Sequence, residues 1–287
     1  MNENKTNINW YHGHMAKTKR ELKEIGSLID IAYEVIDSRM PISSRVEEMD
    51  EIIKDKPRII ISTKYDLCDK KYTDEILDSY RKDNVVIPID LLDDKIDKII
   101  EETNKLMVEV NNKRKEKGLE PRKARVMVIG IPNVGKSSLI NRLCNKKVVG
   151  VGNKPGVTKS INWIRINEDI ELLDSPGILW PKFVDQERAL ILASLMAIKE
   201  EILDREKICS FILDKMFELY PEKLEERYGI TKDLDIVEIY DIIGKKRGCL
   251  VKGGEIDYDR VVDIIIRDFN NNSFGNITFD RLGEWYD

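Results

Sequence analysis

Short apolar runs separated by charged segments dominate the first part of the chain. The runs at residues 31–36, 59–61 and 85–87 are rich in β-branched residues, which is typical of buried strands. The segments between them, at 47–54 and 74–82, carry charged residues at helical spacing. Strands that alternate with helices in this way predict a parallel α/β sheet with helices on its faces.

The middle of the chain continues the alternation. Residues 105–125 are strongly basic and predict a long solvated helix that ends in a loop. Residues 125–129 predict the next strand, and after a glycine-containing loop a helix is expected from about Lys136. The runs at 163–166 and 170–173 flank a polar turn, so they predict a hairpin.

The last part of the chain has a different pattern. From 186 to 227 the apolar residues recur at helical spacing, which predicts a helical region. Residues 245–248 and 253–254 combine basic residues with glycine and are expected to be loops. Residues 257–269 predict a final amphipathic helix.

Length and charge support two domains. A chain of 287 residues is close to two domains of about 150 residues each, and we place the boundary between residues 1–184 and 185–287. The first part has 33 basic and 30 acidic residues, a net charge of +3, and the second has 15 and 23, a net charge of −8. This balance argues against a non-specific nucleic-acid coat, but it permits local basic patches that contact phosphate.

The cysteines and the apolar runs indicate a cytoplasmic protein without a membrane anchor. The chain has four scattered cysteines and only two histidines, so a zinc finger or a disulfide framework is not expected. No apolar run is long enough to cross a bilayer, and the first residues contain no secretory signal.

A phosphate-binding motif lies between the strand at 125–129 and the following helix. Residues 130–137 match GxxxxGK[ST], a loop whose backbone N–H groups surround a polyphosphate. In this pattern Lys136 bridges the β- and γ-phosphates and Ser137 ligates Mg²⁺. The predicted nucleotide contacts of the loop and the helix start are Asn133, Val134, Gly135, Lys136, Ser137 and Ser138.

Two downstream segments add candidate contacts to Mg²⁺ and the γ-phosphate. Asp174 ends the strand at 170–173, so its carboxylate can reach the Mg²⁺ shell, and the Gly177 amide can reach a γ-phosphate. Thr158 lies in a glycine-rich segment and is the best candidate for a hydroxyl that joins Mg²⁺ only when γ-phosphate is present. The alternative is that this segment is an ordinary flexible loop.

A tetrapeptide upstream of the phosphate loop indicates the base. Residues 63–66 resemble the guanine motif NKxD, with Thr63 in place of Asn. Asp66 is expected to accept hydrogen bonds from guanine N1–H and the 2-amino group, neither of which adenine offers. The stem of Lys64 is expected to pack on the face of the base. Because this motif precedes the phosphate loop, the order is that of circularly permuted GTPases, which is tolerable since both loops lie at the carboxyl ends of parallel strands.

Two other classes remain open on these residues alone. The altered base motif permits a P-loop ATPase, which competition between ATP and GTP would reveal. Ile178 stands where Ras-like enzymes have the glutamine that orients the attacking water. A nucleotide-dependent binding switch with little hydrolysis is therefore the second alternative.

With these motifs in order, the chain resembles the ribosome biogenesis GTPase A family of circularly permuted GTPases. The matching stretches are residues 10–17, 37–45, 130–137, 155–158, 174–177, 246–249 and 253–254. The chain departs from the family at Thr63, at His12 in place of a proline, and at residues 89–91, where a Ser-Ala motif is expected.

The resemblance implies a function and further site residues. It implies a GTPase that drives a late step of large (50S) ribosomal subunit assembly and is stimulated by that particle, with rRNA and ribosomal proteins as partners. Separately, we expect the free protein to be monomeric. The resemblance points to His14 as the group that holds the attacking water, the alternative being that His14 binds RNA or packs locally. It also points to Asn133 as a ligand of K⁺, the alternative being that Asn133 only caps the loop. With the Mg²⁺ expected from the phosphate loop, the cofactors are GTP or GDP, Mg²⁺ and K⁺. On charge alone, the candidates for RNA contact are the basic residues Lys17, Lys19, Arg20, Lys245, Lys246 and Arg247, and the alternative is that they form an ordinary solvated face.

Overall fold

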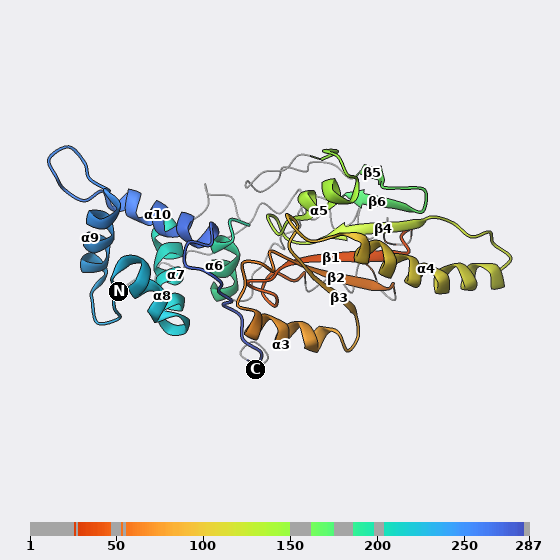
Figure 1. The fold of residues 1–287 in the computed structure, drawn as a ribbon, viewed down its shortest axis with the longest axis horizontal. Helices are drawn as coiled ribbons and strands as arrows, with labels where there is room; N and C mark the ends of the chain where they lie inside the picture. Colours follow the sequence, from red (N-terminus) through yellow and green to blue (C-terminus); the bar gives the residue numbers. More distant parts are fainter. Residues whose placement is uncertain are drawn as a thin grey trace.

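The computed structural model describes residues 26, 28–46, 53, 56–149, 162–174, 186–197 and 204–283. Figure 1 shows two groups of elements along the long axis of the molecule, a sheet flanked by helices and a cluster of helices beside it. The predicted helix at 47–54 lies outside the described residues except for Ile53.

A six-stranded sheet forms the first group, with the strand order β3-β2-β1-β4-β6-β5. The pairs β1–β2, β2–β3, β1–β4 and β4–β6 are parallel, and only β5 runs antiparallel to its neighbour β6. This arrangement confirms the predicted α/β sheet and its terminal hairpin. The strands are β1 (Ile31–Asp37), β2 (Arg58–Thr63), β3 (Val85–Ile89), β4 (Ala124–Ile129), β5 (Asn162–Arg165) and β6 (Ile170–Asp174).

The helices around the sheet are α3 (Lys70–Tyr80), α4 (Asp97–Glu116) and α5 (Lys136–Leu143). They cover a sheet whose central strand β1 is buried along its whole length, which fits a sequence that is apolar apart from Glu34 and Asp37. Helix α3 begins earlier than the charged pattern predicts, because the Asp69 side chain accepts the Lys71 N–H at 3.2 Å and caps the first turn.

The second group consists of helices α6 to α10. Their bounds are α6 (Gln186–Ser194), α7 (Arg205–Leu219), α8 (Pro221–Tyr228), α9 (Ile236–Arg247) and α10 (Tyr258–Asn270). Helix α10 confirms the predicted amphipathic helix, which begins where the Asp257 side chain accepts the Arg260 N–H at 3.1 Å. Buried residues of α10, including Val261 and Ile265, form a core with α7 and α9.

The prediction of a loop at 245–248 was wrong in its first three residues. Lys245, Lys246 and Arg247 form the last turn of α9, and Gly248 ends the helix with a φ of +68°. Cations are stabilised at a helix C-terminus by the helix dipole, and Lys245 also lies 3.6 Å from the carboxylate of Asp241 one turn earlier. The basic residues therefore complete a helix instead of interrupting it.

The chain after α10 returns to the sheet. The Ile277 N–H donates to the Leu67 carbonyl at 3.2 Å, and the Phe279 N–H donates to the Arg39 carbonyl at 3.0 Å. The Asp280 carboxylate accepts hydrogen bonds from the loop after β1. In Figure 1 this dark blue segment leaves α10 and runs toward α3. We call residues 276–280 the C-terminal strap.

The predicted domain boundary between residues 184 and 185 stays a prediction. Strand β6 ends at Asp174 and α6 begins at Gln186, and the residues between them lie outside the described part. Within the described ranges, no helix has both the length and the apolar character needed to cross a membrane.

Candidate active site

The carboxyl ends of adjacent parallel strands bring three loops together. Strand β1 ends at Asp37, β2 at Thr63 and β4 at Ile129, and the sheet order places β1 between the other two. Ligands of open α/β sheets bind outside this edge. Because the predicted guanine and phosphate motifs follow β2 and β4, the fold places them close to each other.

The path of the phosphate loop depends on two glycines. A Cβ atom on Gly130 would lie 2.4 Å from the Val35 carbonyl oxygen, so only glycine allows the loop to pass this close to β1. Gly135 has a φ of +96° and caps α5, a conformation that L side chains rarely adopt. Because the chain turns at Gly135, Lys136 and Ser137 lie in the first turn of α5. The N–H groups at this end of the helix favour the binding of an anion.

The Lys136 ammonium lies inside this loop. Its Nζ donates to the carbonyls of Gly130 at 3.0 Å and Ile131 at 2.8 Å, and the residue is only 7% exposed. The loop therefore gathers a positive charge and helix-terminal N–H groups, which is the chemistry that a polyphosphate requires. The neighbouring predicted contacts are Val134, which is buried, and Ser137 and Ser138, which are partly buried.

Thr63 connects the loop that carries the predicted guanine motif (residues 63–69, called the guanine loop below) to the phosphate loop (residues 130–137). Its hydroxyl lies 2.5 Å from the Val134 carbonyl oxygen and 3.1 Å from that of Ile36. The sequence suggested only that Thr63 lacks the amide of the usual asparagine. The structure shows that the hydroxyl holds the two loops together, a role that depends on a residue 71 positions away.

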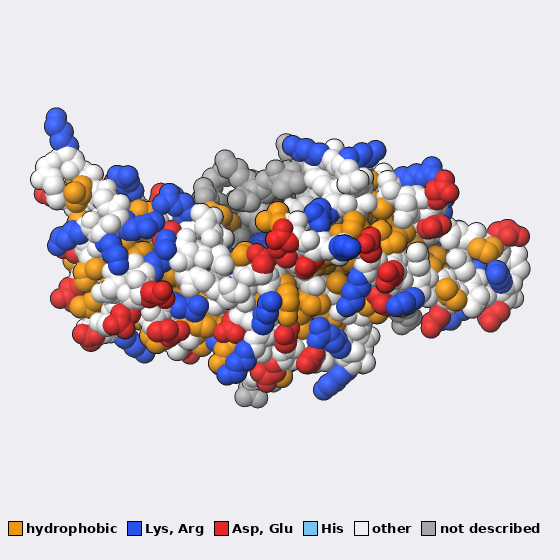
Figure 2. Space-filling view, in the orientation of Figure 1, with side chains coloured by type: hydrophobic (Ala, Val, Ile, Leu, Met, Phe, Trp, Pro, Cys, Tyr) orange, Lys and Arg blue, Asp and Glu red, His pale blue; other side chains and the backbone are white. Residues whose placement is uncertain are grey.

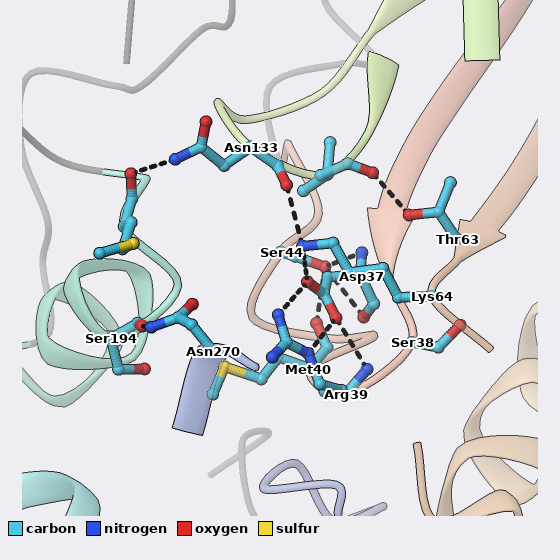
Figure 3. Close-up of polar contacts among 12 residues, drawn as sticks. Asp37, Ser38, Arg39, Met40, Ser44, Thr63, Lys64, Asn133, Ser194 and Asn270 are labelled. Atoms are coloured by element: carbon cyan, nitrogen blue, oxygen red, sulfur yellow. Dashed lines mark hydrogen bonds and ion pairs between the residues drawn. The ribbon is translucent and has the colours of Figure 1, made fainter. Parts of the chain in front are cut away.

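Lys64 makes a second connection between the loops. Its backbone is left-handed, with a φ of +56°, and its Nζ donates to the Asn133 carbonyl at 2.9 Å and to the Asp37 carboxylate at 2.8 Å. Figure 3 shows the Asp37 carboxylate between Lys64 and Arg39. The Lys64 ammonium is thus bound to the phosphate loop, and its stem spans the gap between the two motifs.

Asp37 and Arg39 form a buried ion pair that motif reasoning missed. The Arg39 Nε and a terminal guanidinium nitrogen donate to the Asp37 carboxylate at 3.0 and 2.8 Å, and both residues are at most 2% exposed. Burial disfavours the charged carboxylate, but the charges of Arg39 and Lys64 outweigh burial and hold the pKa of Asp37 below its usual range. Arg39 also donates to the Phe269 carbonyl of α10 at 3.4 Å, so this ion pair joins the sheet to the helical group.

Asp66, the predicted reader of guanine, is exposed at this edge. Partial burial raises the pKa of its carboxyl, and the negative charges of Asp90 and Asp93 add to that effect. The backbone at and just after Asp66 is bound by another segment, because the Asp66 and Cys68 carbonyls accept hydrogen bonds from the Asn276 side chain. The Asp66 carboxylate is thus exposed to solvent on a loop whose main chain is hydrogen-bonded to Asn276.

The Asn133 side chain points toward the helical group. Its φ of +63° is left-handed, and its Nδ2 donates to the Met196 carbonyl, just after α6. Figure 3 shows this amide directed away from Lys64. The amide nitrogen thus connects the two groups of elements, and the Asn133 Oδ1 is the side-chain atom that can ligate a cation.

The structure describes little of the remaining predicted site residues. His14, Thr158 and Gly177 lie outside the described residues. The backbone of Asp174 ends β6, paired in parallel register with Val128 of β4, which places this residue at the same edge as the phosphate loop. Its side chain lies outside the described part, so its role as a Mg²⁺ ligand stays a prediction.

The fold and the loops at its edge define the class of protein. The phosphate-loop motif after β4 and the predicted guanine motif after β2 meet at one edge of a mostly parallel sheet. The guanine loop precedes the phosphate loop along the chain. The protein is therefore a circularly permuted P-loop GTPase.

Comparisons with known proteins agree with this class. The family described as "50S ribosome-binding GTPase" matches residues 125–247. Ribosome biogenesis GTPase A of Priestia megaterium is 43% identical over 281 residues, which cover 96% of this chain and 98% of that protein. The protein of the same name from Thermotoga maritima is 28% identical over 96% of this chain and 94% of its own length.

Solved structures show the same fold. GNP-bound YlqF from T. maritima has a TM-score of 0.62 and 26% identity, and the match covers 92% of this chain and 98% of that chain. A GDP-bound structure of TM YlqF has a TM-score of 0.65 and 24% identity over 92% of this chain and all of that chain. This chain belongs to the ribosome biogenesis GTPase A family.

Proposed function

We propose that this protein binds GTP between its two loops and hydrolyses it in the cytoplasm during a late step of large (50S) ribosomal subunit assembly. The observation that carries the proposal is the pair of contacts from Thr63 and Lys64 to the phosphate loop. These contacts join a base-reading loop and a phosphate loop into one site. The names of its relatives and of the matching family support the ribosomal partner.

Each part of the nucleotide has a candidate partner. The guanine edge meets Asp66, and the phosphates lie on the N–H groups at the start of α5, where Lys136 exchanges its loop carbonyls for phosphate oxygens. Ser137 and Asp174 supply oxygen ligands, which suit Mg²⁺, and Thr158 and Gly177 complete the γ-phosphate contacts. When bound, Mg²⁺ neutralises charge that develops on the phosphate oxygens.

A basic surface on the helical group suits rRNA. Figure 2 shows blue side chains gathered over the upper left end of the molecule, where Figure 1 places α9, α10 and the loop between them, and red side chains along the lower edge. Phosphate contacts of this kind would give a salt-dependent affinity for the particle. The exposed basic residues of this region are Lys245, Lys246, Arg247, Lys252, Arg260 and Arg267.

The 50S particle is expected to stimulate hydrolysis. Turnover of GTP should rise roughly 10-fold or more when purified large subunits are added, because a GTPase that lacks a water-orienting glutamine depends on an activating partner. Turnover and co-sedimentation with each nucleotide measure this. Slow turnover that large subunits leave unchanged would instead favour a binding switch with little hydrolysis.

Potassium is expected to speed the reaction. K⁺ held by the Asn133 Oδ1 would supply positive charge near the phosphates, where charge develops during hydrolysis. We expect turnover about 10-fold faster in KCl than in NaCl at equal ionic strength, and a smaller difference in Asn133→Ala. Equal rates in the two salts would remove K⁺ from the mechanism.

A further inference from the structure

The guanine loop is bound from outside by the C-terminal strap. The Asn276 Nδ2 donates to the carbonyls of Asp66 and Cys68, both at 2.9 Å, and the Ile277 N–H donates to the Leu67 carbonyl at 3.2 Å. A side-chain amide carries two hydrogens, so Asn276 can make both bonds at once. Three successive carbonyls of the loop are thus held by a segment more than 200 positions away.

The contact continues beyond Cys68. The Asp69 N–H donates to the Thr278 hydroxyl at 3.1 Å, and that hydroxyl lies 2.8 Å from the hydroxyl of Thr73. The Tyr220 hydroxyl, at the end of α7, donates to the Asp69 carboxylate at 3.2 Å and accepts the Thr278 N–H at 3.0 Å. Thr73 and Thr278 are fully buried. The strap therefore links the end of the guanine loop to the helical group.

The opposite end of the loop is held by other partners. Thr63 and Lys64 bind carbonyls of the phosphate loop. The exposed carboxylate of Asp66 lies between these two anchored ends. Its position relative to a bound base is thus fixed by the phosphate loop on one side and by the strap on the other.

We propose that the C-terminal strap is a positioning element for guanine recognition, and that Asn276 acts through the Asp66 and Cys68 carbonyls to set how strongly the site prefers guanine. The proposal rests on the assignment of Asp66 as the reader of the base. Hydrogen bonds weaken steeply when their geometry is disturbed, so recognition groups must be held within about 0.5 Å of their productive positions. If the strap is released, the hydrogen bond from the guanine 2-amino group to Asp66 should weaken most. The carboxylate must be placed correctly to accept from the 2-amino group and from N1–H at the same time.

The test compares guanosine diphosphate with inosine diphosphate, which lacks the 2-amino group. In Asn276→Ala, the affinity for GDP is expected to fall about 5-fold, and the preference for GDP over inosine diphosphate should shrink about 2-fold or more. Asn276→Asp should have a larger effect, because its carboxylate cannot donate and would face two carbonyl oxygens. Asn271→Ala is the matched control, since Asn271 is exposed at the end of α10.

The outcomes distinguish a failure of the strap proposal from a failure of the proposed guanine site. If the Asn276 variants keep the native affinity and preference while Asp66→Asn loses GDP, the strap has no role in recognition and the base site stands. An equal loss of both nucleotides would mean general destabilisation, which also contradicts the proposal, and thermal unfolding of each variant would show it. If Asp66→Asn binds GDP normally, the assignment of Asp66 as the residue that recognises guanine is wrong, and the proposal for the strap, which depends on that assignment, is wrong too.

Discussion

The substitution Asp66→Asn is expected to exchange the preferred base from guanine to xanthine. The carboxylate can accept hydrogen bonds from N1–H and the 2-amino group of guanine, whereas an amide would present its own hydrogens to the 2-amino group. Xanthine has a carbonyl at that position and can accept a hydrogen bond from the amide. An unpaired polar group in a binding site costs about 1–3 kcal/mol, so the affinity for GDP should fall roughly 100-fold.

Competition of GDP and xanthosine diphosphate against a fluorescent guanine nucleotide measures this change. Asp90→Asn is the matched control, because Asp90 affects the pKa of Asp66 without a proposed contact to the base. That control should keep its GDP affinity within about 2-fold, as expected for a charge that acts through solvent. Loss of GDP binding without any gain for xanthosine diphosphate would show that Asp66 supports the loop and does not read the base.

The second large effect is expected at His14. We expect His14→Ala to slow GTP turnover on the large subunit roughly 10²- to 10⁴-fold, the range typical of a lost general acid–base or water-holding group. Nucleotide affinity should change little, because the guanine and phosphate contacts lie elsewhere. A residue outside the DxxG segment must orient the attacking water, because Ile178, which follows that motif directly, has an apolar side chain that cannot hydrogen-bond to water.

Single-turnover hydrolysis with saturating large subunits measures the effect of the His14 substitution on the hydrolysis step, apart from any effect on binding. The chain contains only two histidines, so His12→Ala is a natural control from the same segment and should keep nearly native turnover. If both variants are equally slow, the segment as a whole is required and the assignment to one imidazole is wrong. Native turnover in His14→Ala would show that another group orients the attacking water.

The parts of the fold that the sequence predicted well have strong local signals. Strand β2 contains a continuous apolar run at residues 59–61, and β1 is apolar apart from Glu34 and Asp37; such runs form buried parallel strands because both faces are covered. The phosphate loop was recognised because Gly135 and Lys136 stand at a fixed spacing between a strand and a helix. Helix α10 follows from its apolar spacing and from the capping residue Asp257.

The parts that the sequence did not predict depend on contacts between distant segments. The Thr63 hydroxyl meets the Val134 carbonyl only after the sheet has formed. The pairing of Asp37 with Arg39 is local, but its burial against α10 is not. Asn276 carries no motif, and its position on the guanine loop results entirely from the return of the chain after α10.

The central claim is that one site is built from two loops in reversed order along the chain. A crystal structure of the protein with GDP and Mg²⁺ tests this claim most directly. The account predicts the guanine edge against the Asp66 carboxylate and the β-phosphate on the N–H groups at the start of α5, beside Lys136. A base bound away from Asp66, with the phosphates still at Lys136, would contradict it.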